Sequence, residues 1–445
     1  MPIDSLVSLV GKSVYIETYG CQMNFADSEV IRAILNDNGY SVATSADKAD
    51  FVLINTCAIR DNAEKRIRRR LKDLQAVQRH CPWLRIGILG CMAERLKNQL
   101  MVEEESVSFV VGPDAYRKLP DILERTTKGC KVAETELSTE ETYSDISPVR
   151  IDGNGISAYI SIMRGCQNYC AYCVVPYTRG RERSRNAASI VSEARNLFQE
   201  GYKEVTLLGQ NVNSYNSDGT NFAQLMAEVA EINPLLRVRF ATSHPKDLSD
   251  ELLETMAAFP NICKCIHLPV QSGSDHILKL MNRHYSSEWY LNRIEAIRRI
   301  IPDCSITTDI IAGFCSETEE DHNDTLEMFR KVRYDYAFMF MFSMRPDTYA
   351  AKHLKDDVPE DVKRRRLEEI IKLQGQIALE NNKREIGKTY EVLVEGTSHR
   401  SKNQLFGRNS QNKVIVFDRG NVEPGTYVNV KVTDCTAATL IGSIA

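Results

Sequence analysis

The sequence predicts an α/β protein with an N-terminal parallel α/β domain, a partial (β/α)6 barrel and a small C-terminal antiparallel β-barrel. Its 445 residues exceed the size of one hydrophobic core. Strand-like and helical runs alternate over most of the chain, and short alternating strands with glycine turns replace them near its end. A polar, acidic segment at 131–156 predicts a linker. We therefore expect domains at 11–130, 157–382 and 383–445.

The N-terminal domain is predicted from four strand-like runs that helical patterns separate. The runs are Val14 to Thr18, Phe51 to Asn55, Arg85 to Leu89 and Ser108 to Val111. Regular alternation of strands and helices is typical of a parallel sheet.

The middle domain shows six further strand-like runs with helical stretches between them. These runs are Ala158 to Met163, Val205 to Leu208, Val238 to Ala241, Cys265 to Leu268, Ser305 to Ile311 and Ala337 to Phe342. Six units make three-quarters of a full barrel, whose catalytic groups lie at the carboxyl ends of the strands. A charged helix from Lys363 to Leu379 follows. The runs Tyr390 to Val394, Val414 to Phe417 and Tyr427 to Val432 then predict the C-terminal β-barrel.

Composition indicates a globular protein outside membranes. The chain is 43% hydrophobic, has a net charge of -4 and contains no run of 18 apolar residues. The N-terminal residues lack the basic start and long apolar stretch of a signal peptide, so we expect a cytoplasmic location. Thirteen cysteines in a reducing compartment favour metal or redox chemistry over disulfides.

The segment RGCQNYCAYC places Cys166, Cys170 and Cys173 directly after a predicted strand. Iron-sulfur clusters are held by cysteine thiolates, and three ligands leave one iron of a cubane open. A zinc site needs a fourth ligand nearby, which this stretch lacks. Three buried cysteines by accident are the remaining alternative. We predict a 4Fe-4S cluster with an open iron.

Three more cysteines end predicted strands of the N-terminal domain: Cys21 in ETYGCQMN, Cys57 in LINTCAIR and Cys91 in ILGCMAER. Loops after the carboxyl ends of parallel strands meet at one crevice, so these residues predict a second cluster. Three unrelated buried thiols are the alternative. The other cysteines are interpreted as buried thiols: Cys81, Cys130, Cys263, Cys265, Cys304, Cys315 and Cys435.

The CxxxCxxC motif, with Tyr172 before its last cysteine, resembles the signature of radical S-adenosylmethionine (SAM) enzymes. With the N-terminal triad and the C-terminal β-barrel, almost the whole chain resembles the methylthiotransferases, and within them the MiaB type that modifies tRNA. The matching text is TYGCQMN (18–24), Asp27 with Ser28, NTCAIR (55–60), YCVVPYTRGRERSR (172–185), LLGQNV (207–212), TSHP (242–245) and HLPVQSGS (267–274).

The resemblance implies methylthiolation of carbon two of isopentenyladenosine at position 37 of tRNA. It implies two 4Fe-4S clusters, one SAM as methyl donor and one as radical source. The implied partners are the anticodon stem-loop of isopentenylated tRNA, an electron donor such as flavodoxin or ferredoxin, and a sulfur or iron-sulfur carrier. Two alternatives stay within the class: a threonylcarbamoyladenosine tRNA or a ribosomal-protein aspartate as substrate. An RNA-binding iron-sulfur sensor without turnover is a third.

Two stretches depart from the family pattern. Cys315 and Ser316 stand where relatives usually have Pro-Gly, and Asp347 stands where a glycine is usual. Because glycine and proline set backbone conformation in loops, these departures affect the expected loop shape. Neither removes a cluster ligand.

Polar residues at the ends of the barrel strands are candidates for binding SAM. In the resemblance, Gln210 and Asn211 read the methionine amino group, and Ser243, Gln271 and Arg283 contact its carboxylate or ribose. Some of these residues cap helices or bridge loops in the alternative interpretation. The full set of candidate cofactor-binding residues is Tyr172, Gln210, Asn211, Ser243, Gln271, Arg283 and Asp309. His244 and His267 are interpreted as structural rather than as proton shuttles.

RNA-binding candidates come from two regions. The helix EKRIRRRLKDL presents Arg66 and Arg69 among six basic residues, which could contact phosphates or form a solvated face. Residues 383–445 carry more Lys and Arg than Asp and Glu and resemble the TRAM domain of tRNA-modifying enzymes. There we expect stacking and charge from Phe406, Arg408, Lys413 and Phe417, with a core phenylalanine pair as the alternative.

Overall fold

The computed structural model describes residues 12–58, 61–151, 153–398 and 400–445. The chain divides into two compact units. Unit 1 comprises residues 1–151, 163–167 and 173–185, and unit 2 comprises 152–162, 168–172 and 186–445. Across the described ranges, no helix has the length and apolar character needed to cross a membrane.

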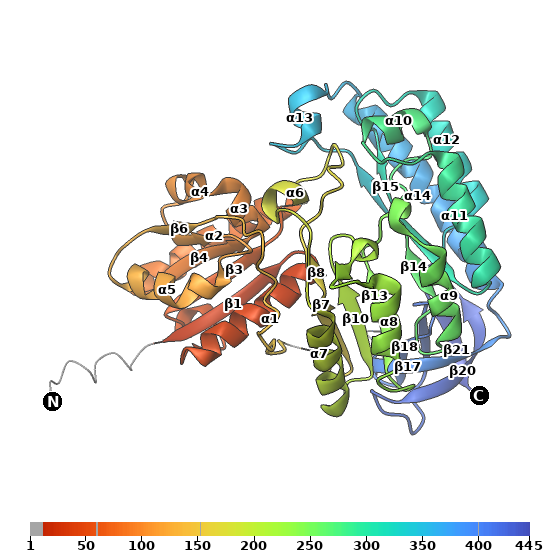
Figure 1. Ribbon diagram of the computed structural model, residues 1–445, viewed down its shortest axis with the longest axis horizontal. Coiled ribbons are helices and arrows are strands. Elements are labelled where there is room, and N and C mark those ends of the chain that lie inside the picture. Colours follow the sequence, from red (N-terminus) through yellow and green to blue (C-terminus); the bar gives the residue numbers. More distant parts are fainter. Residues whose placement is uncertain (1–11, 59–60, 152, 399) are drawn as a thin grey trace. The chain divides into compact units, whose positions relative to one another are not determined.

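Unit 1 contains a six-stranded parallel sheet with the order β2-β1-β3-β4-β5-β6 (Figure 1). The strands are β1 Ser13–Tyr19, β2 Ser41–Val42, β3 Phe51–Thr56, β4 Arg85–Gly90, β5 Val107–Val111 and β6 Val132–Glu134. The helices between them are α1 Gln22–Asp37, α2 Asp61–His80, α3 Cys91–Leu96, α4 Asn98–Glu103 and α5 Leu119–Thr127. The expected strands are confirmed, and the first residues of the segment expected to be a linker form the edge strand β6.

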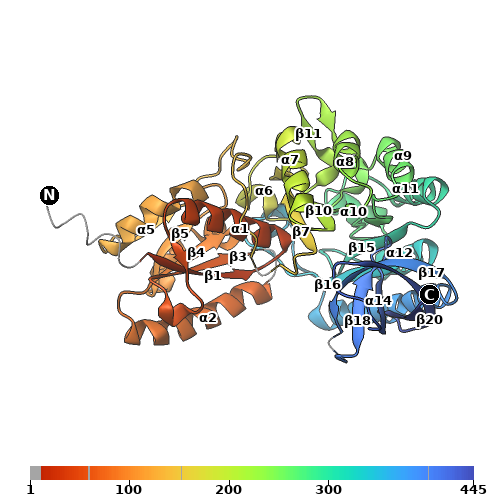
Figure 2. The same cartoon turned by 90° about the horizontal axis from the view of Figure 1, so that it is seen from below.

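Two hydrophobic cores fill the two faces of this sheet, so its strands are apolar on both sides, as parallel strands usually are. On one face, α1 and α5 pack with residues such as Ile31 and Leu123, and on the other α2 packs through Ile67, Leu71 and Leu74 (Figure 2). Both helix layers leave the carboxyl edge of the sheet to the loops that follow β1, β3 and β4.

Unit 2 contains the predicted partial barrel as two three-stranded parallel sheets, β13-β10-β7 and β14-β15-β16. A single bridge from Val238 to Ile262 joins them, and β7 and β16 form the open edges. The strands are β7 Ser157–Ser161, β10 Glu204–Leu208, β13 Arg237–Ala241, β14 Cys265–His267, β15 Ser305–Ala312 and β16 Tyr336–Met341. Its helices are α7 Ala187–Gln199, α8 Phe222–Ala230, α9 Asp250–Ala258, α10 Asp275–Leu280, α11 Ser287–Ile300, α12 Glu319–Val332, α13 Tyr349–His353 and α14 Glu360–Lys383.

The C-terminal strands close into the expected small barrel, with the order β17-β18-β19-β21-β20. They are β17 Thr389–Thr397, β18 Gln404–Arg408, β19 Val414–Asp418, β20 Tyr427–Cys435 and β21 Leu440–Ile444. This small barrel packs against the amino-terminal ends of the larger barrel's strands. Arg237 donates to the carbonyl of Arg408 at 2.7 Å, and Arg239 donates to that of Asn409 at 2.8 Å. The carboxyl ends of the strands therefore remain for the site.

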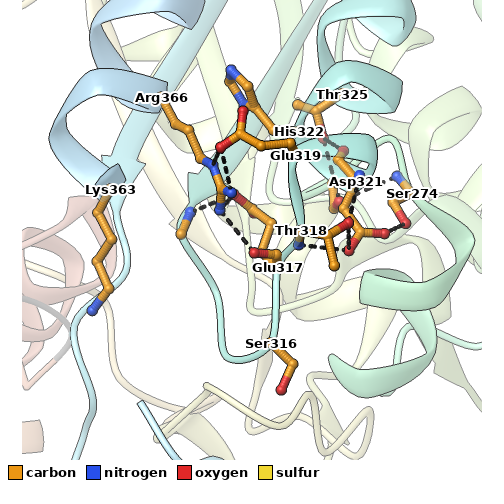
Figure 3. Close-up of polar contacts among 12 residues, drawn as sticks. Ser274, Ser316, Glu317, Thr318, Glu319, Asp321, His322, Thr325, Lys363 and Arg366 are labelled. Atoms are coloured by element: carbon orange, nitrogen blue, oxygen red, sulfur yellow. Dashed lines mark hydrogen bonds and ion pairs between the residues drawn. The ribbon is translucent and has the colours of Figure 1, made fainter. Parts of the chain in front are cut away.

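Helix α14 is fastened to the loop that follows β15 (Figure 3). Arg366, which is buried, donates from Nη1 to Glu317 at 3.1 Å and from Nη2 to Glu319 at 2.8 Å. Lys363 is also buried and pairs with Asp356 at 2.6 Å. Buried charges are stable only when paired, so this network fixes α14 against the barrel.

Five of the short elements lie outside these layers. Strands β8 Met163–Arg164 and β9 Arg183–Ser184 pair antiparallel in unit 1, with α6 Val175–Thr178 between them in sequence. In unit 2, β11 Asn216–Ser217 and β12 Thr220–Asn221 form a hairpin before α8.

Candidate functional site

The three N-terminal cysteines meet at the carboxyl edge of the unit 1 sheet. Cys21 caps α1 directly after β1, Cys57 follows β3, and Cys91 begins α3 directly after β4. A hydrogen bond with the Cys57 thiol lowers the pKa of Cys21 to about 6, although burial opposes the shift. Cys91 lies near enough to interact electrostatically with Cys21, and burial raises the pKa of its own thiol. The fold thus brings together three thiols that are far apart in sequence.

An amide network sets the backbone around these thiols. Asn24 donates to Asn55 Oδ1 at 3.2 Å and to the Thr56 carbonyl at 3.0 Å, and Asn55 returns a bond to the Asn24 carbonyl at 2.8 Å. Gly20 is required beside this network, because a Cβ there would lie 2.3 Å from Asn24 Oδ1 and 2.9 Å from Cys57 Cβ. The TYGCQMN and NTC motifs therefore lock together at the site.

A buried charge network backs the same thiols. Asp27 accepts from Arg164 Nη1 at 2.8 Å and from Arg179 Nη2 at 2.8 Å, and all three side chains are at most 3% exposed. Burial alone would raise the pKa of Asp27, but the two guanidinium groups lower it overall. Arg179 also donates from Nε to Cys91 Sγ at 3.2 Å. A positive charge is therefore held against the thiols.

The unit 1 residues suit an anionic iron-sulfur cluster. Three thiols converge, and Arg179 keeps a buried Nη1 donor with no hydrogen-bond partner in the described part of the chain. Within the described residues, no group of three or more Cys, His, Asp or Glu is arranged to hold a single metal ion. The thiolates of a cubane bind different irons, so they need not converge on one point. Three thiols beside a guanidinium are a donor set that suits an anionic cluster.

The CxxxCxxC loop is divided between the units, with Cys166 and Cys173 in unit 1 and Cys170 in unit 2. The Cys166 amide donates to the Gly180 carbonyl at 3.1 Å, which fixes the start of the loop within unit 1. In unit 2, the amide after Cys170 donates to the Met281 carbonyl at 2.9 Å. The ligand role of these three cysteines remains the prediction made from their spacing.

Arg283 contacts the cysteine loop from within unit 2. Its Nη1 donates to Cys170 Sγ at 3.2 Å and to Tyr172 Oη at 3.4 Å, and its Nη2 donates to the Pro269 carbonyl at 2.8 Å. The Tyr172 ring packs edge-on against Phe314, with 6.4 Å between the ring centroids. Arg283 therefore contacts a predicted cluster ligand, and its expected contact with the SAM carboxylate or ribose stays a prediction.

Unpartnered oxygens gather after the carboxyl ends of β10 and β13. Gln210 Oε1, Asn211 Oδ1 and Ser243 Oγ are buried and have no hydrogen-bond partner among the described residues. Burying a polar oxygen without a partner is costly, so such atoms usually mark a ligand site. Ammonium and hydroxyl groups, which SAM carries, would supply the missing donors. Three of the predicted SAM residues therefore fit the cofactor.

The remaining SAM candidates lie on the neighbouring strands. Gln271 is 7% exposed and adopts a left-handed backbone with φ of 72°, and Thr242 does the same at 74°. Such strain in residues other than glycine concentrates at functional sites. Asp309 lies within β15, with Oδ1 3.4 Å from His267 Nε2. Burial and the nearby Arg283 lower the pKa of His244 to about 2, which favours the neutral imidazole.

The RNA-binding candidates differ in their surroundings. Arg66 and Arg69 are exposed on α2, and Arg66 lies over the Tyr19 ring at 4.9 Å. Arg408 pairs with Glu204 at 3.0 Å and Lys413 with Asp335 at 3.0 Å, so both fasten the small barrel to the larger one. Phe406 is half-buried. The stacking role expected for Phe417 is wrong, because this residue is 1% exposed in the small barrel's core.

Two further expectations can be compared with the structure. Cys130 is exposed, so interpreting it as a buried thiol was wrong, whereas Cys263 and Cys315 are buried. The departures from the family pattern fall on left-handed backbone, with φ of 63° at Ser316 and 69° at Asp347. Glycine adopts this conformation without strain, which explains why relatives use it there. Both loops have left-handed backbone at these positions although neither residue is glycine.

Sequence reasoning missed Arg164 and Arg179 as site residues, although both lie next to the matched motifs. Arg179 belongs to the run YTRGRERSR, whose four arginines resemble a solvated basic stretch, and Arg164 precedes Cys166 by two residues. Burial beside Asp27 distinguishes them, and burial is a property of the fold.

Comparison with known families agrees with the three parts of the chain. Residues 13–112 match the uncharacterized protein family UPF0004, residues 160–329 the radical SAM superfamily, and residues 383–445 the TRAM domain. The solved structure of the radical SAM methyltransferase TsrM from Kitasatospora setae covers 74% of this chain and 73% of its own, with a TM-score of 0.57. At 14% identity, this likeness concerns the fold alone.

Curated relatives match the chain over nearly its full length. A protein from Bacteroides fragilis named tRNA-2-methylthio-N(6)-dimethylallyladenosine synthase is 57% identical over 436 residues, covering 97% of this chain and 95% of the relative. Proteins with the same name are 58% identical in Phocaeicola vulgatus and 55% identical in Chloroherpeton thalassium. They cover 97% of this chain and 95% of each relative.

Proposed function

This chain belongs to the family of tRNA methylthiotransferases that these relatives represent, and we propose that it methylthiolates carbon two of isopentenyladenosine at position 37 of tRNA. The reaction uses one SAM as methyl donor and one as radical source. Likeness to the relatives over 97% of the chain carries this conclusion. The sequence left three alternatives: a ribosomal-protein substrate, a threonylcarbamoyladenosine substrate, and a sensor without turnover. The name that the relatives share favours none of them.

The proposed cofactors are two 4Fe-4S clusters, one on Cys166, Cys170 and Cys173 and one on Cys21, Cys57 and Cys91. When bound, they and SAM supply the one-electron cleavage and the sulfur transfer that amino-acid side chains cannot perform. The chain's own residues hold and orient them. Arg179 places positive charge and an unpartnered donor beside Cys91, and Asp27 fixes the direction of that guanidinium. Arg283 performs a similar task at Cys170.

We propose that Gln210, Asn211 and Ser243 bind the polar groups of SAM. Their unpartnered oxygens support this role, because they accept hydrogen bonds from the ammonium group and the ribose hydroxyls. Gln271 follows β14, and Asp309 lies in the neighbouring strand β15. Tyr172 lies in the cysteine loop and accepts a hydrogen bond from Arg283. A buried, preorganised set of this kind fixes SAM before reaction and excludes water.

Three partner assignments complete the proposal. The tRNA anticodon stem-loop is the substrate, and we infer RNA contacts at Arg66, Arg69 and Phe406. Arg408 and Lys413 support this surface by holding the small barrel to the larger one. A reduced flavodoxin or ferredoxin supplies electrons, and a sulfur or iron-sulfur carrier replaces the sulfur that leaves with the product. A cytoplasmic location is inferred from the tRNA substrate.

The test is reaction of the anaerobically reconstituted enzyme with SAM, a reductant and an isopentenylated anticodon stem-loop. Mass spectrometry of the digested RNA should detect the 2-methylthio derivative, together with deoxyadenosine. Product on a threonylcarbamoylated stem-loop alone would redirect the assignment to that substrate. Deoxyadenosine and RNA products both absent would contradict the enzymatic function.

A further inference from the structure

Large aromatic side chains are exposed on one face of the edge strand β16. Tyr336 is 50% exposed and Phe338 is 45% exposed, whereas Ala337 between them is 1% exposed. The two rings meet edge to face at 5.0 Å between centroids. His267 of β14 packs edge-on against Phe338 at 5.9 Å. These three side chains form one continuous surface, here called the aromatic wall.

Strand register places the aromatic wall on the inner side of the partial barrel. His267, Thr307 and Tyr336 form one row across β14, β15 and β16, and Asp309 and Phe338 form the next. Residues of the opposite face, such as Ile310, are fully buried where helices cover the barrel (Figure 1). The aromatic wall therefore faces inward, next to the open edge that β16 forms.

Inner faces of such barrels are normally filled by side chains, so half-exposed aromatic rings there require an explanation. On the opposite wall, Arg239 bonds to Glu204 at 2.6 Å and to the small barrel's Asn409 and Ser410 carbonyls at 2.8 and 3.2 Å. That wall is covered by protein. The aromatic wall has an apolar surface that an incoming molecule can cover.

We propose that the aromatic wall binds the isopentenyl chain of the substrate adenosine, with Tyr336 and Phe338 as specificity-determining residues. This inference rests on the proposed function, which supplies an apolar five-carbon chain on carbon six of the base. The unpartnered oxygens assigned to SAM follow other strands, β10 and β13, whereas Asp309, paired in register with Phe338, lies where SAM and the isopentenyl chain would meet. Phe338 lies three residues before the end of β16, about 10 Å below the carboxyl edge at ~3.3 Å per residue. A contact to the chain there holds the base without occupying the reacting carbon.

The experiment compares two anticodon stem-loops that differ only in the isopentenyl group. Binding of each RNA to the reconstituted full chain is measured by fluorescence anisotropy for the wild type, Tyr336→Ala, Phe338→Ala and Phe338→Leu. We expect the two alanine variants to bind the isopentenylated RNA about tenfold more weakly and the plain RNA unchanged, because only the isopentenylated RNA loses an apolar contact. Phe338→Leu retains apolar surface and should retain most of the discrimination.

Ile371→Ala is the matched control, because Ile371 is a 47% exposed apolar residue on the outer helix α14. It should leave both affinities unchanged. Equal weakening of both RNAs by the alanine variants would overturn the inference and assign the rings to general RNA stacking. Unchanged affinity for the isopentenylated RNA would also overturn it. Turnover by the wild type tests the proposed function separately, since discrimination in binding requires no turnover.

Discussion

The two regions proposed to bind cofactors differ in the kind of buried atom that lacks a partner. In unit 1, a guanidinium donor of the arginine that contacts Cys91, Arg179 Nη1, lacks a partner among the described residues, as does the carboxyl oxygen Glu94 Oε2 in α3. After strands β10 and β13 in unit 2, the unpartnered atoms of Gln210, Asn211 and Ser243 are oxygens. Donors beside thiols suit an anionic cluster, whereas acceptors suit the ammonium and hydroxyl groups of SAM. Each region therefore has unpartnered atoms that suit the group it is proposed to hold.

The regions also differ in how charge is arranged. Asp27, Arg164 and Arg179 form a buried paired network in unit 1, so the positive charge there is fixed before any cofactor binds. The SAM region of unit 2 uses mainly neutral amides and hydroxyls, whose unpaired state costs less than that of a charge. Breaking the charge network should therefore lower the stability of unit 1. Removing one of the unpartnered oxygens should instead lower the affinity of unit 2 for SAM.

The largest expected effect separates the two cysteine triads. Cys170→Ala should reduce deoxyadenosine formation to background, because the open-iron cluster loses one of its three thiolates. Cys91→Ala should keep deoxyadenosine formation and abolish methylthiolated RNA. Chromatography of both products from the same reactions makes the comparison. If Cys91→Ala still holds iron but forms no deoxyadenosine, the two triads do not have the separate roles proposed for them.

The next effect concerns the buried charge network of unit 1. Arg179→Met leaves the buried Asp27 with Arg164 alone and should lower the free energy of unfolding by about 3 kcal/mol. The control is Arg117→Met, which removes a 42% exposed guanidinium paired with Glu141 and Asp145. That surface variant should cost less than ~1 kcal/mol. Urea unfolding of both variants and the wild type provides the test, and equal losses would contradict the account.

A pH dependence sharpens the description of unit 1. Burial raises the pKa of Glu94 from 4.5 to about 7, and its Oε2 has no partner within the described ranges. Because the folded state favours the protonated acid, stability is complete below pH 4.5 and is lost as pH rises towards 7. Glu94→Gln should therefore raise the unfolding free energy by about 2 kcal/mol at pH 8 and change it little at pH 4.5. An equal increase in unfolding free energy at pH 4.5 and pH 8 would refute the ionisation of buried Glu94 as the cause.

The smallest effect tests an unpartnered oxygen of unit 2. Ser243→Ala should weaken SAM binding about fivefold, as loss of one hydrogen bond of ~1 kcal/mol predicts, and leave stability unchanged. Ser157→Ala is the control, since Ser157 Oγ is also buried without a partner in the described chain. Ser157 lies at the amino-terminal end of β7, whereas Ser243 follows the carboxyl end of β13. Isothermal calorimetry with SAM compares them. Equal affinities in both variants would argue against a SAM contact at Ser243.

Much of this organisation could be predicted from the sequence, because strand-like runs and cysteine spacing are local signals. Cys21, Cys57 and Cys91 each follow a strand of a parallel sheet, and parallel strands end at a common edge. The gathering of the three thiols in unit 1 therefore followed from their positions. The six strands of the partial barrel were predicted for the same reason.

Partners of charged side chains could not be predicted, because burial and ion pairing depend on the complete fold. The sequence does not distinguish the buried Arg179, Arg183 and Arg185 from the exposed Arg181 in the same basic run. Likewise, Arg408 and Lys413 resemble an RNA surface but form ion pairs within the chain. Phe417 precedes two charged residues, Asp418 and Arg419, in the sequence, yet the small barrel closes around its side chain.

The central claim is that two separate triads hold two clusters. Anaerobic iron and sulfide analysis of the reconstituted chain tests it most directly. We expect about eight irons and eight sulfides per wild-type chain, and about four of each in a variant with Cys21, Cys57 and Cys91 all replaced by alanine. About four irons in the wild type, or no change in the triple variant, would contradict the assignment of a second cluster to unit 1.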